Sequence, residues 1–305
     1  MANVHPDPCS TKYTNPLRAS LPHPVLPCED GMPHWKATLA YDGTSYYGWQ
    51  VQPGRSTVQG TLAQALAHLT GEHTLPQGSG RTDTGVHALA QVATFSLSTN
   101  IPTANLHRAL NRALPASIRI LDLTEAPPEF HARHNALRKT YEYRILPRTT
   151  ELETICPPFL APYVWAYPRF LDLSLLNEAA AQVIGTHDFT SFAAVNPDQA
   201  TRQAQHEAEL AAPHETQATP TATNTRTIYS SNWTQDPGPS GLLRYRVTGS
   251  GFLHHMVRNL VGTFVEIGSG RLPANSIPTI LQAQNRSAAG PTAPAHGLFL
   301  YEVEY

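Results

Sequence analysis

The segment with the clearest chemical potential is a glycine-rich stretch, Gly78–Ala88, that holds a single acid at Asp83. Its three glycines allow tight turns and a close approach of a ligand to the backbone. Arg81 lies two positions before the acid. A carboxylate in such a frame can serve as a nucleophile or as a general base, and these residues do not choose between the two routes. A solvated Asp in an ordinary turn is the alternative.

The same stretch contains the Asp-Thr-Gly triplet of aspartic proteases, at Asp83, Thr84 and Gly85. Protease chemistry needs two carboxylates that share one proton. The sequence has no second Asp-Thr-Gly or Asp-Ser-Gly triplet. A dimer with one triplet from each chain is a formal alternative, but the neighbouring Arg81 and the helical content argue against this hydrolase.

No metal site is expected. The pair His254 and His255 is adjacent, has no acid nearby in the sequence, and lacks the four-residue spacing of histidine ligands on a helix. The three cysteines, Cys9, Cys28 and Cys156, form no Cys-x-x-Cys pair. This usage disfavours a disulfide framework and fits a reducing cytoplasm.

Strand and helix patterns surround these residues in two similar runs. The predicted strands are 36–41, 88–95, 117–123, 140–146, 242–249 and 298–305. The predicted helices are one through Leu69 that begins at a capping box, Ser56–Gln59, and three at 106–114, 173–184 and 252–267. We therefore predict the α+β class, with two ferredoxin-like or RNA-binding-like halves, 36–139 and 140–305, whose sheets are antiparallel. One continuous sheet that joins the halves is the alternative.

Two segments are predicted to lie outside the core. Residues 1–35 are rich in proline and read as a disordered extension. Residues 193–225 contain no aromatic residue and read as a surface insertion. The net charge is −2, and the chain without these segments carries +2, which permits a local basic patch for RNA. No apolar run approaches the roughly 20 residues of a membrane span.

The stretch Gly80–His87 resembles the catalytic loop of the TruA family of pseudouridine synthases, whose pattern is G-R-T-D-x-G-V-H. Further stretches resemble blocks of this family in the same order. They are 41–50, 130–133 with 138–143, 187–192, 226–228, 251–259 and 297–300. The resemblance spans residues 36–192 and 226–305, and the order of the blocks makes coincidence remote.

The resemblance implies an isomerase that converts uridine to pseudouridine at positions 38–40 in the anticodon arm of tRNA. It also implies a homodimer with a central basic cleft. The reaction requires no cofactor and no metal. Asp83 is then the catalytic carboxylate, and Arg258 is the residue that reaches it. Burial raises the pKa of a carboxyl group by up to about 3–5 units, and a nearby guanidinium opposes this by about 1–3 units.

The substrate residues are also assigned by resemblance. Tyr141 is predicted to stack on the flipped uracil, whereas Tyr143 is predicted to be a core aromatic. Arg81 is assigned to a phosphate or to the neighbours of the flipped base. Leu298, or in its place Leu300, is assigned to the pocket wall, and plain core packing explains both leucines equally well.

Cations near the middle of the chain are predicted to face the RNA phosphates, which position RNA without reading its sequence. They are Arg133, Arg138, Lys139 and Arg144. A solvated charged surface is the alternative. A third class of function, a non-catalytic RNA-binding protein with a decayed site, is disfavoured because the candidate catalytic residues are intact.

Overall fold

The computed structural model describes residues 32–148, 155–194, 223–237 and 241–305. Most of the predicted extension 1–35 and of the predicted insertion 193–225 lies outside these residues. The first strand, β1, begins at His34, two residues before its predicted start.

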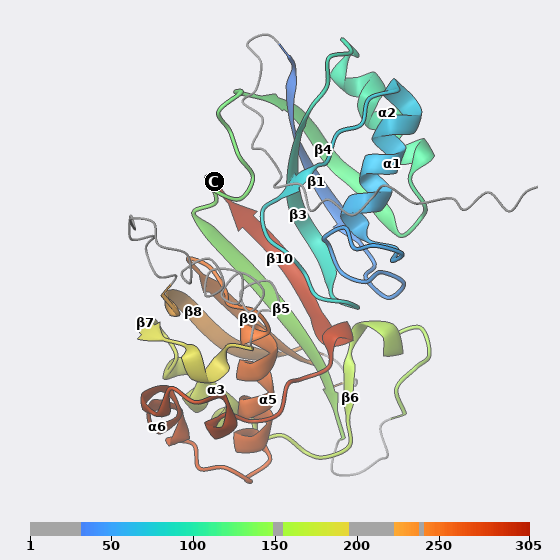
Figure 1. Cartoon of the computed structure of the whole chain (residues 1–305). Coiled ribbons are helices and arrows are strands. Elements are labelled where there is room, and N and C mark those ends of the chain that lie inside the picture. Colours follow the sequence, from blue (N-terminus) through green and yellow to red (C-terminus); the bar gives the residue numbers. More distant parts are fainter. Residues whose placement is uncertain (1–31, 149–154, 195–222, 238–240) are drawn as a thin grey trace, which may run out of the picture.

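The described strands form one ten-stranded sheet (Figure 1). Along the sheet the order is β4 (Ile118–Ala126), β1 (His34–Tyr41), β3 (His87–Ser96), β10 (Leu298–Glu304), β5 (Arg138–Pro147), β9 (Leu243–Gly249), β8 (Thr225–Gln235) and β7 (Gly185–Asp188). Two short strands lie off this path: β2 (Gln77–Gly78) pairs with β3, and β6 (Trp165–Tyr167) pairs with β5. The α+β class holds, and the sheet is continuous.

Strand β10 joins the early and late parts of the chain. It runs parallel to β3, with Phe299 opposite His87, and antiparallel to β5, with Leu300 opposite Tyr141. Strand β6 also runs parallel to β5. The prediction of purely antiparallel sheets is therefore wrong at these two pairings. Periodicity reports which residues form a strand but not the direction of a partner from a distant part of the chain.

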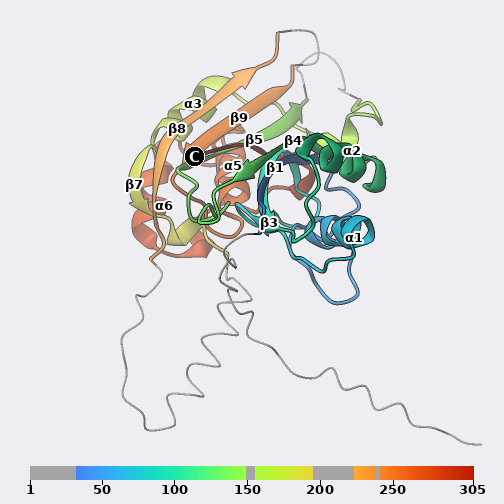
Figure 2. The ribbon, with the colours of Figure 1, turned by 90° about the horizontal axis from the view of Figure 1, so that it is seen from above.

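Two groups of helices flank the sheet (Figures 1 and 2). Near β1 and β4 lie α1 (Val58–Thr70) and α2 (Thr103–Ala113), and near β8 and β9 lie α3 (Leu173–Ala181), α5 (Met256–Gly268) and α6 (Ser276–Ala283). Four of the five described helices match predicted ones. Helix α6 is not predicted from the sequence because it is short and contains a proline.

The predicted capping box of α1 does not form. Thr57, not Ser56, is the N-cap residue, and its side chain accepts a hydrogen bond from the Gly60 amide. The Gln59 side chain donates to the Pro76 carbonyl and accepts from the Val51 amide. Tertiary contacts therefore occupy the glutamine that the box requires.

Alternation along β5 gives the sheet two chemically different faces. Tyr141 lies opposite Leu300 and Val247, and all three side chains are buried in the main core. Glu142 points to the other face, where it is fully buried among arginines. One strand thus carries a tyrosine ring toward the core and a carboxylate away from it.

Among the described residues, no helix combines the length and apolar character that a membrane span requires.

Candidate active site

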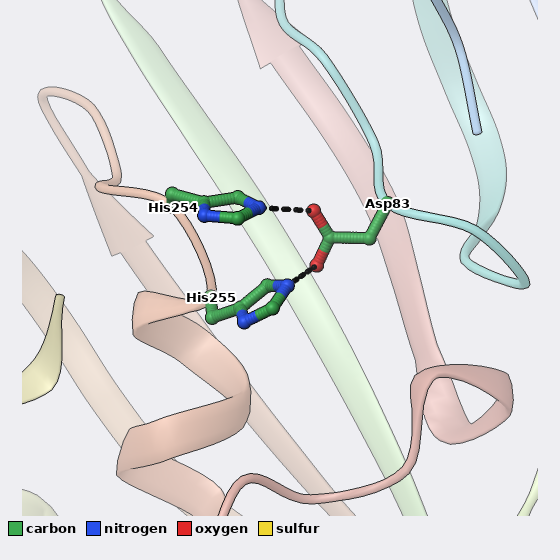
Figure 3. A group of neighbouring side chains, drawn as sticks. All are labelled: Asp83, His254 and His255. Carbon is green, nitrogen blue, oxygen red and sulfur yellow. Dashed lines mark ion pairs between the residues drawn. The ribbon is translucent and has the colours of Figure 1, made fainter. Parts of the chain in front are cut away.

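Asp83 lies on the loop before β3, and its carboxylate points toward the start of α5 (Figure 3). Arg258 Nη1 donates a hydrogen bond to Asp83 Oδ2 at 3.1 Å, and Arg258 Nε donates to the Ala293 carbonyl at 2.8 Å. The Asp83 side chain is 23% exposed and that of Arg258 is 15% exposed. The structure therefore brings together the acid and the guanidinium that the sequence paired, in a place that a ligand can reach.

Two histidines complete the surroundings of Asp83 (Figure 3). His254 Nε2 lies 3.5 Å from Oδ1, and His255 Nε2 lies 3.3 Å from Oδ2. Burial lowers the pKa of His255, although the charge of Asp83 acts in the opposite direction. No acid lies near His254 and His255 in the sequence, so they were not predicted to face one. They lie four and three residues before Arg258, and this spacing is the sequence signal that could have placed them beside Asp83.

Contacts with a second loop hold the backbone around Asp83. Val86 N donates to the Asp83 carbonyl at 3.1 Å, which closes a turn, and Trp49 N donates to the Thr82 carbonyl at 3.1 Å. Gly48 has a φ of +82°, and a Cβ there would lie 2.5 Å from the Thr82 carbonyl oxygen. The stretch 41–50 therefore packs directly on the loop of Asp83. This close contact gives a physical reason for the glycine at position 48.

The start of α5 has an unusual backbone that orients the second histidine. His255 is the N-cap residue, with a φ of 59° and a ψ of 3°, in the left-handed region that few non-glycine residues adopt. Such conformations persist where the surroundings enforce them, often at functional sites. The helix is held in turn by close packing, since a Cβ on Gly262 would lie 1.6 Å from the Pro291 carbonyl oxygen.

Tyr141 lies on β5 with its ring edge-on to Phe252, at a centroid distance of 5.0 Å. Burial raises the pKa of the Tyr141 hydroxyl well above its usual value, and the charges of Tyr41 and Asp83 add to this rise. The hydroxyl is therefore protonated at neutral pH and lies within electrostatic reach of Asp83.

Neighbours of Tyr141 along the sheet are packed in the core. Tyr143 is fully buried, as predicted, and its hydroxyl donates to the Pro294 carbonyl at 2.8 Å. Leu298 lies opposite Tyr143, whereas Leu300 lies opposite Tyr141. Both leucines are buried. The structure thus puts Leu300, more than Leu298, beside the predicted stacking residue.

The cations predicted to face the RNA differ in their surroundings. Arg133 is exposed, as is Arg81, which was assigned to the substrate. Arg138 is 52% exposed, with its guanidinium 4.9 Å from the Tyr229 ring centroid. Lys139 Nζ donates to the Ser79 carbonyl, at the beginning of the loop of Asp83, and burial lowers the pKa of this lysine to about 8.

Arg144 lies on the opposite face of the sheet from Tyr141. Its Nε donates to Glu142 Oε1 at 2.8 Å, and its guanidinium lies 3.9 Å from the Phe299 ring centroid. His87, which belongs to the glycine-rich segment, is buried on that face too, where its Nδ1 accepts from the Gly43 amide at 3.0 Å. Neither residue joins the group around Asp83.

The arrangement suits a carboxylate anion that acts on a bound ligand. Nitrogen groups of Arg258, His254 and His255 face its two oxygens. Aspartic protease chemistry instead requires a second carboxylate that shares a proton with the first. The basic surroundings of Asp83 favour nucleophilic or general-base chemistry by a single acid.

Comparison with known proteins matches the same regions. The family model described as tRNA pseudouridine synthase matches residues 37–135 and 179–305. A protein of Solibacter usitatus is 45% identical over 268 residues, which cover 88% of this chain and 97% of the relative. A protein of Moorella thermoacetica is 43% identical over 276 residues (90% and 100%), and one of Bacillus pumilus is 40% identical over 272 (88% and 98%). All three relatives are named tRNA pseudouridine synthase A.

Proposed function

The chain belongs to the tRNA pseudouridine synthase family, and from that premise we propose that Asp83 is the carboxylate through which it isomerises uridine in the anticodon arm of tRNA. The observation that carries the proposal is the 3.1 Å contact between Asp83 and Arg258. It joins two segments far apart in the chain, and both lie within the region that matches the family.

The reaction rearranges one nucleotide without adding or removing atoms. The bond between N1 and C1′ breaks, the base turns, and C5 bonds to C1′, while C5 loses a proton and N1 gains one. Asp83 acts either as a nucleophile at C1′ or as a base at C2′. Both routes begin with the carboxylate anion. The Arg258 guanidinium, whose Nε donates to the Ala293 carbonyl, stabilises this anion in either route. No change of oxidation state occurs, so the proposal includes no redox cofactor.

A uridine must leave the base stack to meet Asp83, and stacking on a protein side chain offsets part of that cost, a few kcal/mol. We assign this stacking to Tyr141, whose ring orientation is supported by Phe252. Arg81 is assigned to a phosphate beside the flipped nucleotide. Leu298, with Leu300 beside Tyr141, is assigned to the wall of the pocket.

The tRNA is proposed to lie in a basic cleft between two α+β halves, in a cytoplasmic homodimer that modifies positions 38–40. The exposed groups of Arg133 and Arg138 support contacts with the phosphates. Lys139 and Arg144, assigned the same role from the sequence, also have protein partners in Ser79 and Glu142. For these two residues we propose a contribution to the position of the loop and the sheet as well.

The test of the catalytic assignment is Asp83→Asn, which keeps the size of the side chain and removes its charge. We expect the rate of tritium release from C5-labelled tRNA to fall by at least about 10³-fold, as for other residues that carry the chemical step. Affinity for tRNA should change little. Asp122→Asn, at an exposed position of β4, is the matched control and should turn over normally. Wild-type turnover by Asp83→Asn would overturn the assignment.

The target position is tested separately by mapping pseudouridines in tRNA from cells with and without this protein. Loss of pseudouridine at positions 38–40 alone is the expected result. Loss at positions outside the anticodon arm would show that the target is wrong, even if Asp83 is the catalytic residue.

A further inference from the structure

We propose that Asp83, His254 and His255 also form a binding site for one divalent transition metal ion of the Zn²⁺ class, and that this ion and the target uridine exclude each other. The three side chains come from two loops that the fold brings together (Figure 3). The exclusion rests on the proposed role of Asp83, whereas the binding does not.

The distances between the three side chains suit such an ion. Zn²⁺ binds histidine nitrogen at about 2.0–2.1 Å and carboxylate oxygen at about 2.0–2.2 Å, so neighbouring ligand atoms of a tetrahedral site lie about 3.3–3.6 Å apart. His254 Nε2 lies 3.5 Å from Asp83 Oδ1, and His255 Nε2 lies 3.3 Å from the other oxygen, Oδ2. One ligand atom from each residue can be chosen so that all three lie within 4.8 Å of one another. Both imidazoles reach an ion on one carboxylate oxygen only after the side chains rotate toward one another.

The ligand types select the class of ion. Two imidazoles and one carboxylate, with one position left open, form a ligand set that Zn²⁺ and related transition metals accept. Mg²⁺ and Ca²⁺ prefer oxygen ligands. The side chains of Asp83, His254 and His255 are 23%, 31% and 28% exposed, so an ion can enter from solvent and keep a water molecule on its open side.

Two groups around the site act on the affinity in opposite ways. Arg258 donates to Asp83 Oδ2 and leaves Oδ1 available, and hydrogen bonds of this kind orient carboxylate ligands. Its positive charge, however, repels a cation. His254 Nδ1 is buried and has no partner among the described residues, so it lacks the acceptor that usually supports a metal-bound histidine. We therefore expect weaker binding than at a structural zinc site.

Occupation by a metal removes the group that the reaction needs. An ion on an Asp83 oxygen takes the lone pair that would attack C1′ or accept the proton from C2′. The ion also fills space next to that oxygen. Either route of the isomerisation is blocked while the ion is bound, and release of the ion restores it.

The binding test is a titration of the full, tag-free chain with Co²⁺, without RNA, followed by visible absorption. We expect one equivalent of Co²⁺ to give an absorption band that Zn²⁺ removes. His254→Asn and His255→Asn should each weaken binding by at least about tenfold, as loss of a supporting group already does at metal sites. Asparagine suits position 255 because it tolerates the left-handed backbone there.

The matched control is His134→Asn, because His131 and His134 form another close pair, with ring centroids 4.3 Å apart. This variant should bind Co²⁺ like the wild type. Failure of the wild type to bind Co²⁺, or unchanged binding by the His254→Asn/His255→Asn double variant, would overturn the site.

A second arm tests the exclusion by following tritium release at increasing Zn²⁺. Inhibition should rise with the occupancy measured by Co²⁺ displacement, and a chelator should reverse it. A metal-loaded enzyme that turns over normally would overturn the exclusion alone. Wild-type turnover by Asp83→Asn would instead defeat the proposed function, and the Co²⁺ titration would still report on the site.

Discussion

A single carboxylate becomes chemically useful through the groups that face it. At Asp83 the imidazole of His254 lies near one oxygen, and the imidazole of His255 and the guanidinium of Arg258 lie near the other. Arg258 cannot swing away freely, because its Nε is bonded to Ala293. The direction in which the carboxylate points is thus decided by groups on another segment of the chain.

Tyr141→Phe should lower kcat by up to about tenfold, the effect of one neutral hydrogen bond that we expect the hydroxyl to make with the bound nucleotide, and change tRNA affinity less. The substitution keeps the stacking ring and removes only the hydroxyl, whose raised pKa leaves it protonated. Single-turnover tritium release and tRNA binding would separate the two effects. Tyr143→Phe is the control: its hydroxyl is bonded to Pro294, so stability should suffer and turnover should not. Equal losses of turnover and affinity in Tyr141→Phe would contradict the prediction.

Strand β5 connects the site to the other face of the sheet. Tyr141 points toward Phe252, and the next residue, Glu142, is fully buried on the opposite side. Glu142 accepts hydrogen bonds from Arg144, Arg244 and Arg246 at 2.8–2.9 Å. Burial by itself raises the pKa of Glu142, but the hydrogen bonds and charges of these arginines outweigh it, and the net shift is downward.

Glu142→Gln should destabilise the protein by about 1–3 kcal/mol at neutral pH, because it removes charge-assisted hydrogen bonds to arginines that are partly exposed, one of which, Arg244, keeps Asp236. Since the folded-state pKa of Glu142 is lowered, the unfolded chain takes up the proton first on acidification. The stabilisation is therefore complete above the ordinary pKa of glutamate and is lost as the pH falls through the lowered value. Urea unfolding of both proteins at decreasing pH should show the difference shrinking.

The control for this substitution is Glu302→Gln, at an exposed position of β10. Surface changes of this type usually stay within about 0.5 kcal/mol. A similar small effect of Glu142→Gln at neutral pH would show that the buried carboxylate contributes little to the stability of β5.

At the scale of the whole molecule, the continuous sheet separates β3, which follows the loop of Asp83, from β9, which precedes α5, by the two strands β10 and β5. The C-terminal strand is inserted in the middle of the sheet, between the strand that follows Asp83 and the strand that carries Tyr141. The site therefore requires nearly the whole described chain, from β1 to β10, to be folded.

Removal of residues 1–30 should leave turnover and tRNA affinity within about twofold of the full chain, because every described element begins later, at His34 or beyond. Removal through residue 40 takes away most of β1, which pairs with both β3 and β4. This longer truncation should not fold. Tritium release and urea unfolding of both truncated chains test the prediction. An inactive 31–305 chain would show that the first residues contribute to function.

Much of this protein follows from patterns within short stretches of sequence. Apolar spacing located four of the five described helices and six of the ten strands, since these elements follow local periodicity. Strand β8 lacks such a pattern because, apart from Ile228 and Trp233, its side chains are not buried apolar residues. The resemblance of residues 80–87 to one family's catalytic loop also singled out Asp83.

Only the tertiary structure decided what lies next to Asp83. The parallel pairing of β10 with β3 and the approach of His254 and His255 to the acid join residues far apart in the sequence. The same holds for Arg144, whose guanidinium lies over the ring of Phe299, a residue far along the chain. Local periodicity records whether a side chain faces a core or solvent. Which residues meet across the fold depends on the path of the whole chain, and periodicity does not encode that path.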